Sequence, residues 1–174
     1  YLMLADLYSR QNNFSRAIDY NLKALTLFQQ KNDKFRLLNI YEQVGSMYER
    51  QNMLSKALEY YSMALKVYRE INNKTGEAAA LINLARIQLA QGKTTLSIAS
   101  YEQAYNLVTP LHILPLEVRS LIGLAKANTL NKEYEAANLQ YRKAIVLAKK
   151  AGMKIELEEA YEGLSEVYKG LKDP

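Results

Sequence analysis

Residues 37–68 read LLNIYEQVGSMYERQNMLSKALEYYSMALKVY, and this stretch returns in altered form at a constant spacing, without insertion or deletion. The recurrence is easiest to follow at a pair of apolar and small residues. The pair stands at Leu4-Ala5, Val44-Gly45, Leu84-Ala85, Leu124-Ala125 and Leu164-Ser165. The period is about 40 residues, and a fixed period of about 20–50 residues indicates a solenoid, in which each repeat buries its apolar face against its neighbours. The sequence therefore predicts a repeat architecture.

Each repeat is expected to contain two helices joined by short turns. In the repeat quoted above, the first helix is predicted from about Lys34 to Gln51 and the second from about Leu54 to Ile71. Apolar and small residues of the first helix recur at intervals of three and one, which places them on one helical face. They are Leu37, Ile40, Tyr41, Val44, Gly45 and Tyr48. The turns are rich in Asn and Gly, which tolerate the left-handed conformation that ends a helix. The predicted fold class is all-α, built from antiparallel helix pairs.

The period divides the chain into one array over residues 1–174. We place repeat 1 at residues 1–33 with a truncated first helix, and repeats 2, 3 and 4 at residues 34–73, 74–113 and 114–153. Residues 154–174 are expected to form the first helix of a fifth repeat. Because the chain starts within a repeat and ends where a turn is due, we expect it to be a fragment of a longer protein.

The junction between repeats 3 and 4 differs in composition from the others, because residues 109–115 read TPLHILP. Pro110 is expected to end the preceding helix, and Pro115 suits the first turn of the next one. His112 is the only histidine of the chain. It is expected to be a structural or exposed residue of this elbow, since a lone histidine has no partner for base or metal chemistry.

Small residues mark the predicted close contacts between helices, because two helices approach closely only where one lacks a bulky side chain. One column would let the two helices of a repeat meet, and a second column would let each repeat meet the next. The columns are Ala5, Gly45, Ala85 and Ala125, and Ala24, Ala64, Ala104 and Ala144. Tyr61, Tyr101 and Tyr141 lie between these contacts, and their large apolar rings predict core packing.

Composition excludes several classes of function. The 174 residues are 49% hydrophobic and 24% charged, which is typical of a globular protein. Without cysteine, the chain has no disulfide, thiol nucleophile or cysteine metal site. Its net charge of +5 is scattered rather than gathered in a basic stripe, which speaks against nucleic-acid binding. No apolar run approaches the ~18 residues of a membrane span, so we expect no membrane insertion of this segment. Localisation stays open between cytoplasm and periplasm.

Residues suited to catalysis or cofactor binding are scarce. The sequence has neither a Gly-rich phosphate loop nor a His-Glu-x-x-His pattern. The helix-borne glutamates near the C-terminus lack the Asp- and Gly-rich loop of a calcium site and are expected to form a solvated face. They are Glu156, Glu158, Glu159, Glu162 and Glu166. We therefore expect no catalytic, cofactor-binding or metal-binding residue in this segment.

The repeat columns resemble the tetratricopeptide repeat. Repeat 2 matches the family pattern throughout, at Tyr41, Val44-Gly45, Tyr48, Ala57, Tyr61 and Ala64. Three positions depart from it, because Gln88, Asn128 and Asn21 replace aromatic residues. The resemblance implies a right-handed superhelical solenoid. The period of about 40 residues, against the usual ~34, resembles the long-helix variant found in sensory regions of bacterial histidine kinases and transcription regulators.

In the family, the first helix of each repeat lines a binding groove. Groove-facing positions near the middle of this chain are apolar and basic, at Ile82, Asn83, Arg86, Leu89, Arg119, Ile122 and Lys126. This mixture predicts a seat for a protein or peptide segment that is acidic and partly apolar, either extended or helical. The alternative is that these side chains are simply exposed. The Lys/Asn clamp of the Hsp70- and Hsp90-binding members is absent, since Leu2, Glu42, Ile82 and Ile122 occupy the lysine column.

The sequence thus favours a non-enzymatic protein- or peptide-binding module, the sensory or assembly region of a larger signalling protein of the two-component type. Two alternatives are a small-ligand or peptide-pheromone receptor domain, and an intracellular scaffold or adaptor that self-associates. The last helix, from about Lys154 to Leu171, carries an apolar stripe of which only one side is expected to be covered. The stripe is Ile155, Leu157, Tyr161, Leu164, Val167 and Tyr168, and it predicts a homodimer or a further covering helix.

Overall fold

The computed structural model describes residues 1–172, and every helix predicted above is present. Described residues form helices joined by short turns and contain no strand, which confirms the all-α prediction. In repeat 2 the two helices differ from the predicted bounds by one residue at the C-terminal end. The helices are α1 Leu2–Arg10, α2 Phe14–Gln30, α3 Lys34–Arg50, α4 Leu54–Glu70, α5 Lys74–Ala90, α6 Thr94–Val108, α7 Leu114–Leu130, α8 Tyr134–Ala151 and α9 Lys154–Lys172, with a 3-10 turn η1 at Thr109–Leu111.

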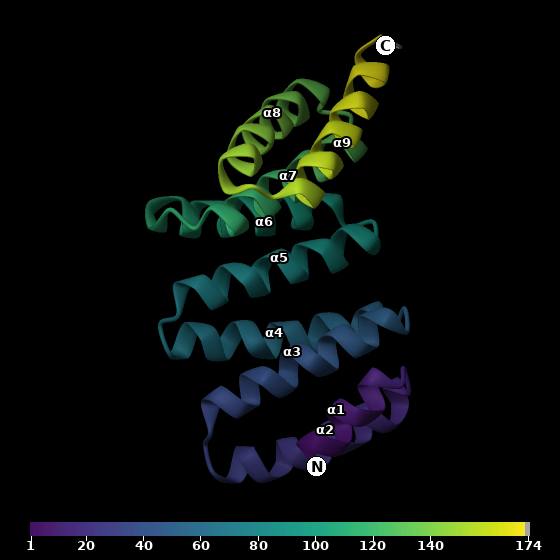
Figure 1. The fold of residues 1–174 in the computed structure, drawn as a ribbon, viewed down its shortest axis with the longest axis vertical. Coiled ribbons are helices and arrows are strands. Elements are labelled where there is room, and N and C mark those ends of the chain that lie inside the picture. The colour runs from purple at the N-terminus through teal and green to yellow at the C-terminus, as the bar shows by residue number, and fades with distance from the viewer. Residues whose placement is uncertain (173–174) are drawn as a thin grey trace. The chain divides into compact units, whose positions relative to one another are not determined.

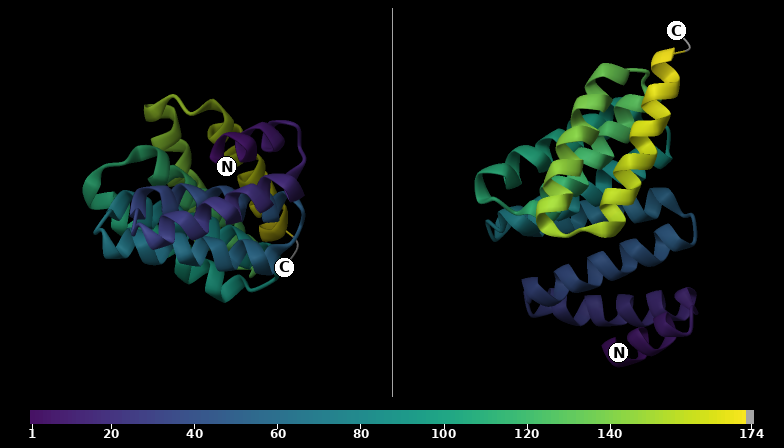
Figure 2. Two further views of the ribbon diagram at one scale, coloured as in Figure 1. Left: turned by 90° about the horizontal axis from the view of Figure 1, so that it is seen from below. Right: turned by 45° about the horizontal axis from the view of Figure 1, so that its top comes forward.

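The helices gather into two compact units, Tyr1–Asn73 and Lys74–Pro174, divided at the predicted boundary between repeats 2 and 3. In the first unit, α2 packs against α1 and α3, and α3 packs against α4 (Figure 1). In the second unit, α5 to α9 pack in chain order, and the first helices of successive repeats, α5, α7 and α9, also lie side by side. Figure 2 shows α9 running alongside α8. Within the described residues, no helix is long and apolar enough to cross a membrane.

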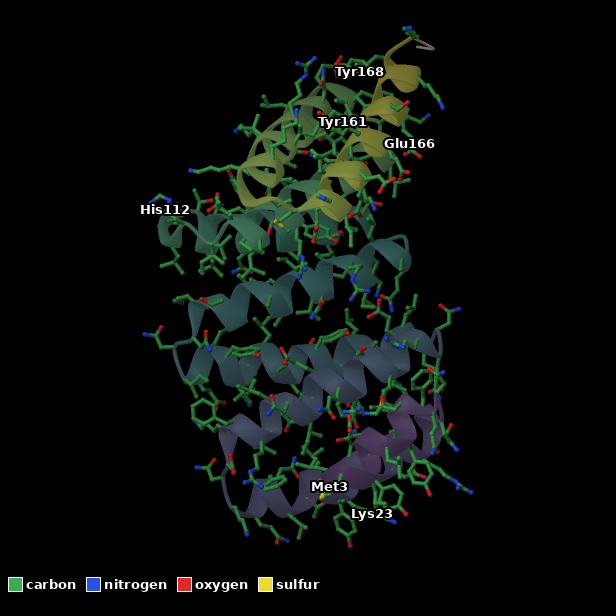
Figure 3. All side chains as sticks on the ribbon, in the orientation of Figure 1. Met3, Lys23, His112, Tyr161, Glu166 and Tyr168 are labelled. Carbon is green, nitrogen blue, oxygen red and sulfur yellow. The ribbon has the colours of Figure 1, made fainter. Side chains whose placement is uncertain are left out.

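The turns share one backbone conformation that recurs at half the sequence period. Each turn between two α-helices holds one residue with positive φ, at Asn12, Asn32, Asn52, Asn72, Gly92, His112, Lys132 and Gly152. Asn and Gly fill six of these positions, as their tolerance of the left-handed region predicts. His112 and Lys132 are exceptions that composition does not signal. His112 follows η1 at the elbow, where α6 ends at Val108 before Pro110 as predicted (Figure 3).

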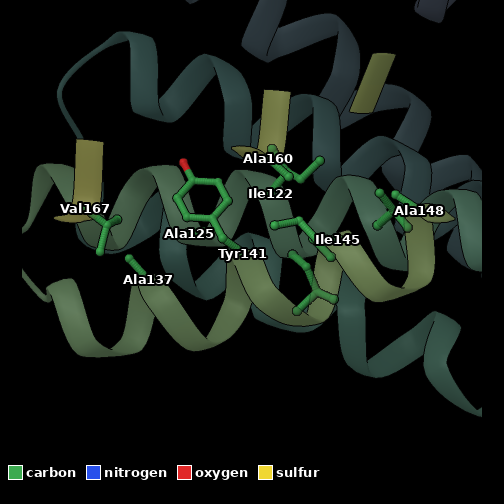
Figure 4. Packing of buried hydrophobic residues seen from close by; sticks show 11 residues of the cluster. Ile122, Ala125, Ala137, Tyr141, Ile145, Ala148, Ala160 and Val167 are labelled. Atoms are coloured by element: carbon green, nitrogen blue, oxygen red, sulfur yellow. The ribbon is translucent and has the colours of Figure 1, made fainter. Parts of the chain in front are cut away.

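The columns of small residues are buried, as expected for close helix contacts. Ala5, Ala64, Ala85, Ala104, Ala125 and Ala144 are all fully buried. The tyrosine column is also core, with Tyr61, Tyr101 and Tyr141 exposed by only 3%, 4% and 1%. Figure 4 shows the cluster around Tyr141, which joins α7, α8 and α9 through Ala125, Ile145 and Ala160.

Two of these tyrosine rings lie directly on glycines of the next repeat. A Cβ atom at Gly123 in α7 would collide with the ring of Tyr101 from α6, and one at Gly163 in α9 would collide with the ring of Tyr141 from α8. The two glycines occupy one repeat column, which holds Gln43 and Asn83 in the earlier repeats. In unit 2, this column therefore lets the end of each phenol ring pass over the neighbouring helix.

The departures Gln88 and Asn128 from the aromatic pattern have a structural explanation. The residue 12 positions later in the chain, on the second helix of the same repeat, changes together with them. Where the first residue is Tyr the second is Tyr, and where the first is polar the second is polar. In unit 1, the Tyr8–Tyr20 and Tyr48–Tyr60 ring centroids are each 5.5 Å apart. In unit 2, Ser100 donates to Gln88 at 2.9 Å and Asn128 donates to Gln140 at 2.9 Å.

The apolar stripe of α9 is covered on one side only, as expected. Val167 is fully buried against α7 and α8. Ile155, Tyr161 and Tyr168 remain exposed by 78%, 46% and 39%, and Figure 3 shows the two tyrosines on this helix. Tyr168 also accepts a hydrogen bond from Nη2 of Arg142 at 2.6 Å.

Candidate functional site

The seven predicted groove residues lie together in unit 2 and line one pocket of about 680 Å³. Four belong to α5, at spacings of one, three and three residues, and three belong to α7, at spacings of three and four, so each set lies on one side of its helix. Helix α9 closes the pocket with Ile155, Glu156 and Glu159. The structure thus brings every predicted site residue into a single cavity.

The apolar part of the lining runs across all three helices. Ile82 and Leu89 come from α5, Ile122 from α7 and Ile155 from α9. Ile122 is buried in the core of the unit, whereas Ile155 is largely exposed at the rim. The pocket therefore offers a ligand apolar surface both at its floor and at its rim. Each Å² of apolar surface that the ligand buries would contribute about 25 cal/mol to binding.

Arg119 and Lys126 each pair with a carboxylate of α9. Nε of Arg119 lies 3.3 Å from Oε1 of Glu156, and Nζ of Lys126 lies 2.5 Å from Oε1 of Glu159. The expectation of a solvated glutamate face is therefore wrong for Glu156, whose side chain is only 18% exposed, and holds for Glu159, whose side chain keeps 41% exposure. It failed for Glu156 because α9 packs against α7 and presents its first turns to the groove. The remaining glutamates, Glu158, Glu162 and Glu166, are exposed.

Arg86 is the third predicted cation. Its Nη2 donates to Oδ1 of Asn83 at 3.3 Å, one helical turn earlier on α5. Desolvation in the groove lowers the pKa of this guanidinium, and nearby Tyr101 opposes the shift. Because the ordinary value lies so far above neutrality, Arg86 keeps its positive charge.

Tyr101 and Gly123 also line the pocket, and the sequence did not assign either residue to it. Burial raises the pKa of Tyr101 to about 12, with the charge of Arg86 acting downward and that of Glu159 acting upward. The hydroxyl is therefore a neutral hydrogen-bond donor at physiological pH. The change from Asn83 to Gly123 in one repeat column was a sequence signal for this opening. This signal can be interpreted only when the position of the Tyr101 ring over Gly123 is known.

Unit 1 carries a more polar pocket of about 540 Å³, lined by residues of α1, α2 and α3. Its charged groups have partners within the unit. Arg10 pairs with Asp6 at 2.9 Å, Arg50 lies over the ring of Phe14, and Glu42 accepts a hydrogen bond from Tyr68. Over residues 1–172, no group of three His, Cys, Asp or Glu side chains is placed to hold a metal ion.

Solved structures with this fold come from several kinds of protein. BtubC (BKLC) from P. vanneervenii has a TM-score of 0.86 at 23% identity, over 98% of this chain and 71% of that chain. A Signal Transduction ATPase with Numerous Domains (STAND) protein with a tetratricopeptide repeat sensor, from Pyrococcus horikoshii, has a TM-score of 0.88 at 24% identity, over 97% and 26%. A Rap protein complexed with Competence and Sporulation Factor has a TM-score of 0.78 at 16% identity, over 98% and 51%. At these identities the likeness shows the fold alone.

No curated protein sequence matches the chain. Two family models do match it, both described as tetratricopeptide repeat, one over residues 1–35 and the other over residues 36–109. Together they span residues 1–109, more than half of the 174 residues. The chain therefore belongs to the tetratricopeptide repeat family, whose repeats serve as protein-interaction modules.

Proposed function

We propose that the pocket formed by α5, α7 and α9 binds a peptide segment of a partner protein. In this proposal the chain is the sensory or assembly region of a larger signalling protein of the two-component type. The observation that carries the proposal is the pocket itself, in which apolar side chains and three cations from two helices converge. Such a surface suits a short segment that buries apolar side chains and places a few polar groups.

The charges of the pocket define the ligand further. A carboxylate of the ligand must compete with Glu156 for Arg119 and with Glu159 for Lys126. A modestly acidic and largely apolar segment therefore fits better than a highly acidic one. The same competition would make the pocket selective, because weakly charged or basic segments gain nothing from displacing α9 carboxylates.

The structural neighbours are compatible with a sensory role. One contains a tetratricopeptide repeat sensor, and another was solved with Competence and Sporulation Factor. Because this chain spans only 26% and 51% of those two chains, the activity of a whole protein built around it is part of the proposal. The Rap complex also supports the second candidate, a receptor domain for a small ligand or a peptide pheromone.

A third candidate is a scaffold or adaptor that self-associates. Exposed Tyr161 and Tyr168 on α9 favour it, since they would be buried if a second copy docked on this face. Light scattering over a range of protein concentrations distinguishes self-association through α9 from peptide binding by a monomer. Self-association would raise the molar mass with concentration, and Tyr161→Arg would abolish the rise without affecting the pocket.

The peptide proposal is tested with ligands selected from a random peptide library on the wild-type protein. Exchanging Arg119 and Lys126 together for Glu should abolish binding of the selected peptides, while circular dichroism keeps the wild-type helix content. A second variant carries Gln at both positions. It shows whether the loss of binding comes from the missing cations or from repulsion between the introduced glutamates and Glu156 and Glu159. The control is Lys150→Glu, an exposed charge reversal on α8 outside the pocket. Peptides that bind the Arg119/Lys126 variants as tightly as wild type would contradict the proposal.

A further inference from the structure

The three tyrosines of the core column differ in what their hydroxyl groups contact. Tyr61, Tyr101 and Tyr141 stand one repeat apart and are all nearly fully buried. In each case, the residue 12 positions earlier lies on the first helix of the same repeat. That residue is Glu49, Leu89 and Thr129, respectively.

Two of the three hydroxyls have a partner at that earlier position. Tyr61 donates to Oε2 of Glu49 at 3.1 Å. Thr129 is the hydrogen-bond partner of the Tyr141 hydroxyl, and it accepts there because its own proton is donated to the carbonyl of Ala125 at 2.8 Å. Leu89 offers Tyr101 no polar group. Among residues 1–172, the structure shows no hydrogen bond to the Tyr101 hydroxyl.

The Tyr101 hydroxyl lies at the pocket and not in the interior. The hydroxyl end of its ring rests on Gly123, which lines the pocket, and Tyr101 itself lines it as well. The two charged groups that act on this hydroxyl, Arg86 and Glu159, are also lining residues. A hydroxyl that lines a pocket and has no partner in the protein is available to a ligand or to water.

We propose that the Tyr101 hydroxyl is a recognition group of the pocket and donates a hydrogen bond to a carbonyl or carboxylate oxygen of the bound segment, an inference that rests on the proposed peptide-binding function. Arg86 beside it favours an oxygen acceptor over a donor. Leu89 and Ile122 flank the same point, so the acceptor should be next to an apolar side chain of the segment. Specificity follows because a segment without an acceptor at this point leaves the hydroxyl unpaired.

The first test removes the hydroxyl alone. Tyr101→Phe should weaken a peptide selected on the wild-type protein by about fivefold to tenfold, the size of one net hydrogen bond. The matched control is Tyr61→Phe, which removes a hydroxyl that already has a partner in unit 1. This control should lower thermal stability and leave peptide affinity unchanged, whereas Tyr101→Phe should keep the wild-type melting temperature.

The second test gives Tyr101 the internal partner that its counterpart Tyr141 has. Leu89→Thr supplies a hydroxyl at the position equivalent to Thr129, and Leu89→Val is its control of equal shape. The threonine variant should bind the peptide several-fold more weakly than the valine variant. In the Tyr101→Phe background, Leu89→Thr and Leu89→Val should bind the peptide equally, because the threonine hydroxyl then has no tyrosine hydroxyl to bond to. Equal affinities of the two variants with Tyr101 present would contradict the assignment.

The outcomes separate this inference from the function on which it rests. If the selected peptides require Arg119 and Lys126 but bind Tyr101→Phe with wild-type affinity, the Tyr101 assignment is overturned and the peptide pocket stands. If the library yields no peptide that depends on the pocket, the proposed function fails. Replacing each acidic residue of the peptide by alanine then identifies the acceptor, because alanine has no side-chain oxygen. Loss of the Tyr101→Phe effect points to a carboxylate, and its retention points to a carbonyl.

Discussion

At the scale of single residues, the packing of rings on glycines in unit 2 leaves little room for change. A Cβ at Gly123 would meet the rigid ring of Tyr101, whereas a Cβ at Gly45 would lie 3.0 Å from the nearest atoms of Tyr61. The first contact cannot be relieved by a flexible side chain. The second needs a shift of only a few tenths of an ångström.

We therefore expect Gly123→Ala to destabilise the protein by about 1–3 kcal/mol through overpacking, despite the helix propensity gained. Gly45→Ala should cost much less. Urea unfolding followed by circular dichroism measures both. Combining Gly123→Ala with Tyr101→Leu should restore much of the loss, and a double variant as unstable as the single one would locate the strain elsewhere.

A second residue-scale prediction concerns Asn21, which stands where the family pattern has an aromatic residue. Its side chain is fully buried, and neither its Nδ2 nor its Oδ1 has a hydrogen-bond partner. Asn21→Leu should raise the free energy of unfolding by about 1–3 kcal/mol, because an unpaired buried amide is removed. The comparison is Asn13→Ala in the N-cap of the same helix. There Oδ1 accepts from the Arg16 backbone, and the loss should cost about 1 kcal/mol. Two changes of the same sign would contradict this reading.

At the scale of elements, the turns offer a direct test. Lys132 adopts φ of 63° in the turn between α7 and α8, a conformation that costs a side-chain-bearing residue about 1–2 kcal/mol. Lys132→Gly should therefore raise stability by about 1 kcal/mol, while Lys132→Ala should bring no gain. The reciprocal change, Gly92→Lys at φ of 74°, should lower stability by a similar amount. Thermal and urea denaturation distinguish these signs.

Element boundaries follow from the sequence because local patterns determine them. The stop at Val108 before Pro110 and the starts at Lys34 and Leu54 depend on residues within a few positions. Left-handed His112 and Lys132 do not follow in this way. Their conformation is imposed by the packing of the flanking helices, which overrides a weak local preference. The same holds for Glu156 and Glu159, since their partners lie 37 and 33 residues away in the chain.

At the scale of the whole molecule, the uneven charge of the sequence is partly resolved inside unit 2. Residues 1–155 carry 21 basic and 12 acidic residues, a balance of +9, and residues 156–174 carry 2 and 6, a balance of −4. The two groove ion pairs join these regions across α7 and α9. The columns of the repeat indicate that the seven predicted residues share one side of α5 and α7, but they do not identify Tyr101 or Gly123 as lining residues. The pairing of Arg119 with Glu156 and of Lys126 with Glu159 depends on contacts between repeats, which the columns do not encode.

Alkaline pH should unfold the protein through its buried tyrosines. Burial raises the pKa of Tyr60, Tyr61, Tyr68, Tyr101 and Tyr141, to about 12 for Tyr101. Their stabilising contribution is complete below the unfolded value of about 10 and is lost as pH rises through the folded values. The free energy of unfolding should therefore fall between about pH 10 and 12. Urea melts measure it, and Tyr101→Phe should show a shallower fall than wild type.

The left-handed residue at every twentieth position also sets a reading frame for the backbone. Joining Gly92 directly to Glu133 removes the length of one whole repeat and leads from α5 into α8, with a turn of the same handedness and the same inward faces. Removing one residue fewer would rotate every later helix by about 100° and turn its core outward. We therefore expect insertions and deletions to preserve the buried helix faces only when they add or remove whole repeats. The length of the array can change freely while each helix stays in frame.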